Sequence, residues 1–162
     1  MKAECERQGI TLEKYEQLKI EAAAQWYRND GGIIIIPRHQ LSGAIVQVIG
    51  SAPKALRGQF DRDNFRALVH IGEFTTDREK ADGVFSRFVK LEGSNQRSWQ
   101  ENEFIGCYLG KGEPFNANGV IELPNEKVAD TVKALLTAAV ESVGVGAAHK
   151  MGFGRGVIVT WT

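Results

Sequence analysis

The chain has 162 residues, 43% of them hydrophobic and 25% charged, and its 20 lysines and arginines balance 20 aspartates and glutamates. This composition excludes a chain that is mainly disordered, and the length allows a core that needs no disulfide or structural metal. The net charge of zero lacks the basic surplus typical of nucleic-acid-binding proteins. Residues 32–100 carry most of the local surplus, ten bases against seven acids, which permits a local basic surface.

The cysteines and the apolar runs predict where the protein acts. Cys5 and Cys107 are the two cysteines, and they form no CxxC motif or Cys/His cluster with ligand spacing, so we expect no disulfide framework, metal or cofactor. The longest purely apolar run, 33–37, is far shorter than the roughly 20 residues that span a bilayer. No signal-peptide-like segment follows Met1. We therefore expect a cytoplasmic protein that has no membrane partner.

Residues 1–31 are predicted as an N-terminal helical extension. Thr11 is a plausible N-cap, and the helix that follows would end near 29–32. Its apolar residues recur at three- and four-residue steps and would pack against another element: Leu12, Tyr15, Leu18, Ala22 and Trp26.

A second helix is predicted after Pro37, which suits the first turn of a helix and follows the short β-branched run 33–36. Its apolar positions form one face: Leu41, Ala44, Ile45, Val48 and Ile49. Arg38, Ser42 and Gln47 fall on other faces.

The rest of the chain predicts strands around one further helix. Residues 51–66 are expected as a basic loop, and strands are expected at 67–74, 84–91, 104–109 and 119–123, the last two as a hairpin. Asn125 would cap a helix with an apolar face over 128–143, and a final strand would cover 157–161. This order favours a single α+β domain over 1–162, with an antiparallel sheet and helices packed on one face.

The segment 144–156 has the pattern G-x-G-x5-G-x-G. It contains Gly144, Gly146, His149, Lys150, Gly152, Gly154 and Arg155. A structural interpretation makes Gly144 a helix C-cap and places the last two glycines at a strand entrance. A functional interpretation has the bare backbone approach a polyanion while Lys150 and Arg155 add charge-assisted contacts. The spacing matches neither a dinucleotide fingerprint nor a P-loop.

This loop resembles the signature loop of the RAMP superfamily of CRISPR-associated proteins. Residues 36–45 are also similar to the I-P-G-S-S-[LI]-K-G-A-[LI] stretch that opens the first helix of the family's backbone subunits. The matching residues are Ile36, Pro37, Leu41, Gly43, Ala44 and Ile45, and the departures are Arg38, His39, Gln40 and Ser42. Some phage-encoded proteins of unassigned role have similar glycine-rich endings.

The resemblance implies a ferredoxin-like, RRM-like fold whose glycine loop and first-helix region contact an RNA backbone. The family's backbone subunits assemble along a guide RNA, which implies partners: RNA or another single strand, further copies or other ribonucleoprotein subunits. The expected contact residues are those of the loop together with Arg38, His39 and Ser42. The length leaves no room for the tandem second domain of the family's processing enzymes, which favours a binding subunit without catalysis.

Two alternatives remain open. One is a metal-independent endoribonuclease of the same superfamily, in which His39 or His149 acts as the base, because histidine titrates near neutral pH. The other is an assembly or scaffold protein of phage origin, which the neutral net charge favours.

Overall fold

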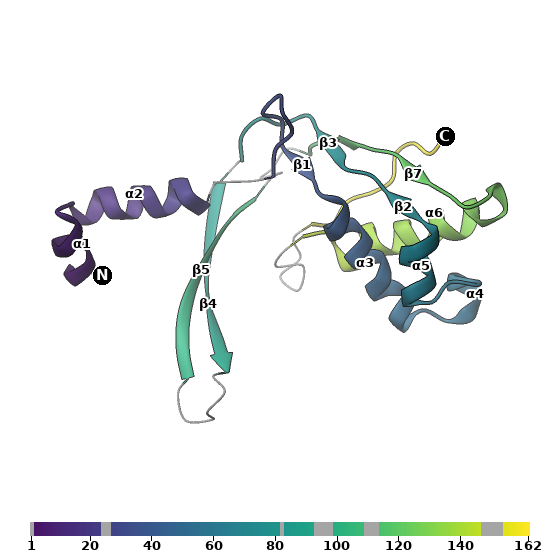
Figure 1. The fold of residues 1–162 in the computed structure, drawn as a ribbon, viewed down its shortest axis with the longest axis horizontal. Coiled ribbons are helices and arrows are strands. Elements are labelled where there is room, and N and C mark those ends of the chain that lie inside the picture. Colours follow the sequence, from purple (N-terminus) through teal and green to yellow (C-terminus); the bar gives the residue numbers. More distant parts are fainter. Residues whose placement is uncertain (1, 24–26, 82, 93–98, 109–113, 147–153) are drawn as a thin grey trace. The chain divides into compact units, whose positions relative to one another are not determined.

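In the computed structural model of the protein, residues 2–23, 27–81, 83–92, 99–108, 114–146 and 154–162 are described, with side chains over 5–18, 27–81, 114–146 and 154–162. Figure 1 shows the fold, which is α+β: helices combine with small antiparallel sheets. Contacts divide the chain into two compact units, one of residues 1–34 with 77–116 and one of 35–76 with 117–162. The single domain over 1–162 stays a prediction.

The first unit begins with two helices, α1 (Lys2–Gln8) and α2 (Leu12–Ala23). The predicted N-cap is confirmed, since Thr11 Oγ1 accepts a hydrogen bond from the Lys14 amide at 3.2 Å. Both helices lie in the predicted helical extension 1–31, but a separate helix before Thr11 was not predicted. Leu12 and Leu18 remain 43% and 41% exposed, so these two residues of the apolar stripe are only partly covered.

A long two-stranded ribbon completes this unit. β4 (Gly83–Glu92) pairs antiparallel with β5 (Trp99–Tyr108), in a register that runs from Gly83 opposite Tyr108 to Glu92 opposite Trp99. The predicted hairpin between 104–109 and 119–123 is therefore wrong. β5 pairs instead with the strand just before it in the chain, as strands that are neighbours in sequence commonly do.

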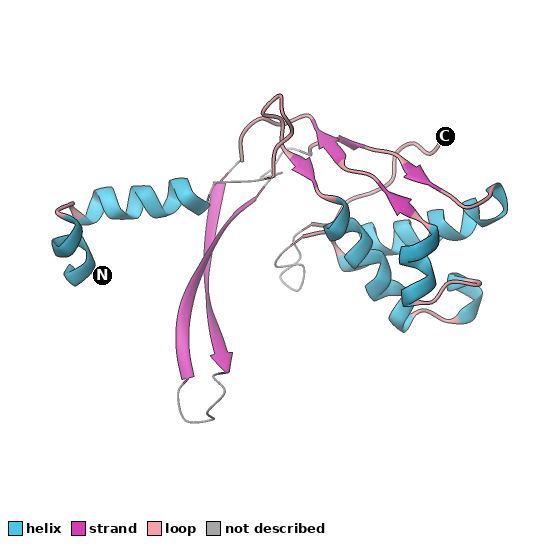
Figure 2. Cartoon of the chain, viewed as in Figure 1, coloured by secondary structure: helices cyan, strands magenta, loops and turns pink. Residues whose placement is uncertain are grey.

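The helices of the second unit are α3 (Arg38–Ser51), α4 (Lys54–Arg57), α5 (Arg62–Leu68), η1 (Glu126–Val128), α6 (Ala129–Ala138) and the π-helical turn η2 (Ala139–Val143). Helices α4 and α5 replace the loop expected over 51–66. The reason for α5 is a capping box: Asp61 accepts from the Asn64 amide, and Asn64 Oδ1 accepts from the Asp61 amide, both at 2.8 Å. Figure 2 shows these helices on one side of the strands of the same unit.

Five short strands form the sheets of this unit. β1 (Ile35–Ile36) pairs with β3 (Phe74–Thr76), and β3 pairs with β6 (Ala117–Asn118). β2 (His70–Ile71) pairs with β7 (Ile121–Glu122), and all of these pairings are antiparallel. Between the two ladders the Gly72 amide donates to the Val120 carbonyl at 2.9 Å. The strand predicted over 67–74 thus begins later, because α5 extends to Leu68.

The core of this unit lies between α3, α5 and α6. Ile45, Phe60, Phe65, Val132 and Leu135 are fully buried, and the two phenylalanine rings meet edge to face with centroids 5.3 Å apart. The predicted apolar face of α3 is confirmed, because all five of its residues are buried.

The predicted final strand is wrong, since residues 155–162 carry no strand. The alternation of buried and exposed side chains on which the prediction rested is nevertheless present. Ile158 packs against the core, whereas Val157 and Val159 are 71% and 83% exposed. The segment therefore covers the core by its side chains without joining a ladder in the described part of the chain.

Candidate nucleic-acid interface

The first turn of α3 carries two of the predicted contact residues. Pro37 occupies the N-cap with extended φ and ψ and without a side-chain cap, and no acidic residue lies in the first turn. Arg38 and His39 follow, and both are exposed. Because the N-terminal end of a helix has a partial positive charge, this end of α3 presents a local positive potential.

Next to this turn lies a hollow of about 220 Å³, here called the α3 hollow. Its lining residues come from α3 and from the start of the glycine loop: His39, Gln40, Gly43, Ala44, Gln47, Gly144 and Gly146. The structure thus brings together the two segments that carry the family resemblance. Within this group, His39, Gly144 and Gly146 were predicted contact residues, whereas Gln40, Gly43 and Gln47 were not.

The π-helical turn η2 explains how the glycine loop reaches α3. The Gly144 amide donates to the Ala139 carbonyl at 2.8 Å, which closes the turn. Gly144 then adopts a φ of 90° and Gly146 a φ of 93°. A Cβ on Gly146 would lie 3.5 Å from Gln40 Oε1, so the loop passes close to α3. The positive φ of Gly144 agrees with the C-cap interpretation, although its ψ of 152° is not that of a left-handed helical cap.

The described ends of the glycine loop are held by internal hydrogen bonds. The Val145 amide donates to the Gly154 carbonyl at 2.8 Å, and the Gly156 amide donates to the Val140 carbonyl at 3.1 Å. With the Gly144 amide, three amides of segment 144–156 thus donate to carbonyls of the protein. Those three amides are therefore not available to a phosphate.

The remaining predicted contact residues are placed as follows. His149, Lys150 and Gly152 lie outside the described residues. Arg155 is exposed, and Ser42 is half-buried on α3. Gly154 has a φ of 76° and is exposed. Within the described part of the chain, neither Arg38 nor Arg155 has a carboxylate partner.

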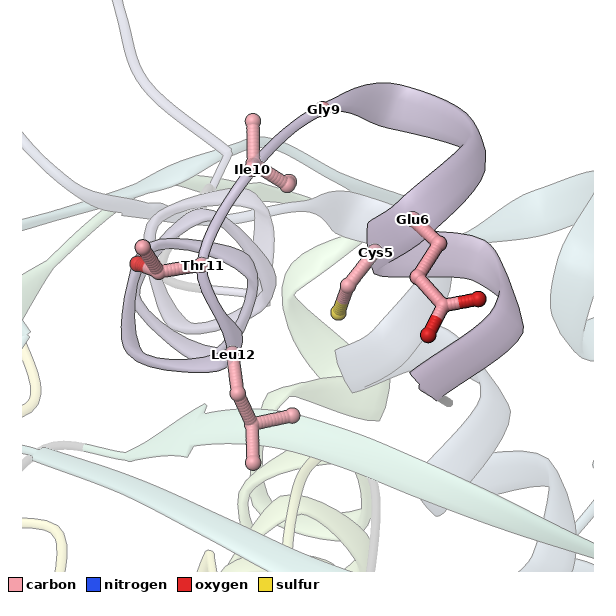
Figure 3. Close-up of a pocket in the computed structure, with 6 residues that line it drawn as sticks. All are labelled: Cys5, Glu6, Gly9, Ile10, Thr11 and Leu12. Atoms are coloured by element: carbon pink, nitrogen blue, oxygen red, sulfur yellow. The ribbon is translucent and has the colours of Figure 1, made fainter.

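A second hollow, of about 420 Å³, lies at the corner between α1 and α2. Figure 3 shows its lining residues around the connecting turn, among them Cys5 and Glu6. Cys5 is a buried free thiol. The described residues hold no group of three histidine, cysteine or acidic side chains that could bind a metal, and they include no helix able to cross a membrane.

Comparisons with known proteins add no relative. No family model matches the chain, and neither a curated protein nor a solved structure does.

Proposed function

We propose that this protein binds RNA, or another single-stranded nucleic acid, through the surface formed by the first turn of α3 and the α3 hollow. The proposal includes a binding role of RAMP type, a ferredoxin-like arrangement of the second unit, and assembly with further subunits along the strand. The observation that carries it is the α3 hollow, where His39 and Gln40 lie beside Gly144 and Gly146. These are the two regions whose residues resemble the family.

The charge at the start of α3 supports a polyanionic ligand. Phosphate groups bind favourably at helix N-termini, where the macrodipole is positive and amides point outward. Arg38 adds a guanidinium that can donate two parallel hydrogen bonds to a phosphate. Since the first turn has no acidic residue, no like charge opposes the ligand there.

The glycines of the hollow support a close approach of the ligand. Gly43 lies in the middle of α3, where glycine costs roughly 1 kcal/mol of stability compared with alanine. A Cβ at this position would meet no atom within 4 Å, so packing inside the described protein does not require a glycine. A ligand that lies against the backbone of α3 would explain why glycine occupies this position.

The family resemblance implies that loop amides hold the phosphates, but three of these amides are engaged elsewhere. The amides of Gly144, Val145 and Gly156 donate to carbonyls of the protein itself. The proposal therefore rests on side chains of α3 and on Arg155. Basic side chains of this kind position the backbone of the strand without reading its sequence.

The test is a titration of binding against salt. Fluorescence anisotropy would measure the affinity of the full chain for a labelled single-stranded RNA at several salt concentrations. For the Arg38→Ala and Arg155→Ala double variant we expect weaker binding and a salt slope shallower by about 0.7 for each phosphate that the variant no longer neutralises. Arg66→Ala is the matched control, because Arg66 is an exposed arginine of α5 that does not line the hollow. Equal affinity and slope in the parent and the double variant would refute the proposal.

A further inference from the structure

Among the residues that the structure describes, the lining of the α3 hollow carries no carboxylate, ammonium or guanidinium group. Two carboxamides, those of Gln40 and Gln47, and the imidazole of His39 supply its polar side-chain atoms. In the part of the chain that is described, neither carboxamide has a hydrogen-bond partner. Each offers one acceptor oxygen and a donor NH₂ group.

This chemistry suits a neutral group better than a phosphate. A phosphate carries only acceptor oxygens, and its strong contacts in proteins come from charged donors. The nearest charged residue in sequence, Arg38, lies outside the lining. The edge of a nucleobase, by contrast, alternates donors and acceptors, which a carboxamide can match on both sides at once.

The shape of the hollow also limits the ligand. Its volume of about 220 Å³ is smaller than the roughly 300 Å³ at which pockets for drug-sized molecules begin, so it admits one small group. Gly43 lies on the α3 side and Gly144 and Gly146 on the loop side, all without side chains. A flat ring can therefore lie close to the backbone of both segments.

We propose that the α3 hollow receives one unstacked nucleobase of the bound strand, and that the carboxamides of Gln40 and Gln47 read its edge, with adenine preferred. The preference follows because a glutamine carboxamide pairs in bidentate fashion with the donor and acceptor that adenine presents on one edge. Single-stranded nucleic acids expose bases in this way. The inference rests on the proposed function. It adds that the α3 hollow selects a base, whereas the first turn of α3 contacts only the sugar-phosphate backbone of the strand.

The experiment measures, by fluorescence anisotropy at one salt concentration, the affinity of the full chain for labelled oligo(A), oligo(U) and oligo(C) of equal length. We expect the parent to bind oligo(A) roughly tenfold more tightly than oligo(U), within the range that one bidentate pair gives. The Gln40→Ala and Gln47→Ala double variant should bind all three alike. Gln59→Ala, at an exposed glutamine outside the hollow, should keep the preference.

A second variant tests the same inference if the double substitution disturbs folding. Gly43→Leu fills the hollow from its α3 side, leaves both carboxamides in place and replaces glycine by a better helix former. It should also remove the preference for oligo(A). Equal binding of the three oligonucleotides by the parent would overturn this inference and leave the proposed function standing. A preference that persists in the variants would also overturn it, and absence of binding to every oligonucleotide would overturn both.

Discussion

Val145 and Gly154 are joined by a hydrogen bond of 2.8 Å from the amide of the first to the carbonyl of the second. They lie near opposite ends of the glycine loop, so this bond closes the loop at its base. It also explains one of the glycines. A Cβ on Gly154 would collide with the Val145 carbonyl oxygen, and the φ of 76° at this position favours glycine on its own.

Gly154→Ala should therefore destabilise the protein by about 1–3 kcal/mol, because the substitution combines an unfavourable φ with a steric clash. The free energy of unfolding from urea titration would show the loss. Gly156→Ala is the control in the same segment. Its Cβ would make only an ordinary contact with Val140, at 3.5 Å, so its effect should be small. Equal effects of both substitutions would contradict the role given to Gly154.

Unlike Gly154→Ala, Gly43→Ala should stabilise the protein, and it should also weaken RNA binding. The position is helical and open, so alanine should stabilise the protein by about 0.5–1 kcal/mol. If a ligand approaches the α3 backbone here, the same substitution weakens RNA binding. Gly58→Ala is the contrasting variant, because Gly58 has a φ of 56° and its Cβ would come within 3.3 Å of Thr131. A Gly43→Ala protein that is more stable and binds RNA as well as the parent would contradict close approach.

Asp61→Ala should cost about 0.5–2 kcal/mol of stability, since the Asp61 carboxylate accepts from two amides at the start of α5. Thermal unfolding followed by circular dichroism would measure the change. Glu73→Ala removes an exposed carboxylate between β2 and β3 and should change stability by less than about 0.5 kcal/mol. Similar values for the two variants would mean that the capping box does not stabilise α5.

Phe60→Ala should destabilise the second unit by about 3–5 kcal/mol, because the ring is fully buried and packs edge to face on Phe65. Val159→Ala removes apolar atoms from a side chain that is 83% exposed, and it should be nearly neutral. Urea titrations of both variants would check this difference. A small loss for Phe60→Ala would place the core of the unit elsewhere.

Local patterns predicted the helices better than the strand pairings. The three- and four-residue spacing of Leu41, Ala44 and Ile45 fixed the buried face of α3, because that pattern depends only on neighbours in the sequence. Helix α5 was missed although its signal was present. The capping box there has Asn64 at the position where glutamate or glutamine is usual.

Pairing between strands could not be predicted in the same way. The partner of β5 depends on which strand is near in space, and the sequences of β4 and β7 are both compatible with it. The final segment has the alternation of a strand, but burial of Ile158 against the core satisfies that pattern without a ladder.

The candidate site was predicted in part. His39, Gly144 and Gly146 were singled out from the sequence, and the structure brings them to one hollow. Gln47 lies eight residues after His39, with Gly43 halfway between, a spacing that puts all three on one face of a helix. That spacing was a usable signal, but its meaning depends on the packing of α3 against η2, which places the loop beside this face.

The most direct test of nucleic-acid binding at the α3 hollow is ultraviolet crosslinking of the full chain to single-stranded RNA, with the attached peptides identified by mass spectrometry. Trypsin would release residues 39–54, which hold most of α3, and residues 134–150, which hold the start of the glycine loop, as separate peptides. We predict that crosslinks concentrate in these two peptides and decline in the Arg38→Ala and Arg155→Ala double variant, whose first peptide begins at residue 29. Crosslinks confined to other peptides, or none under conditions where a known RNA-binding protein is labelled, would contradict it.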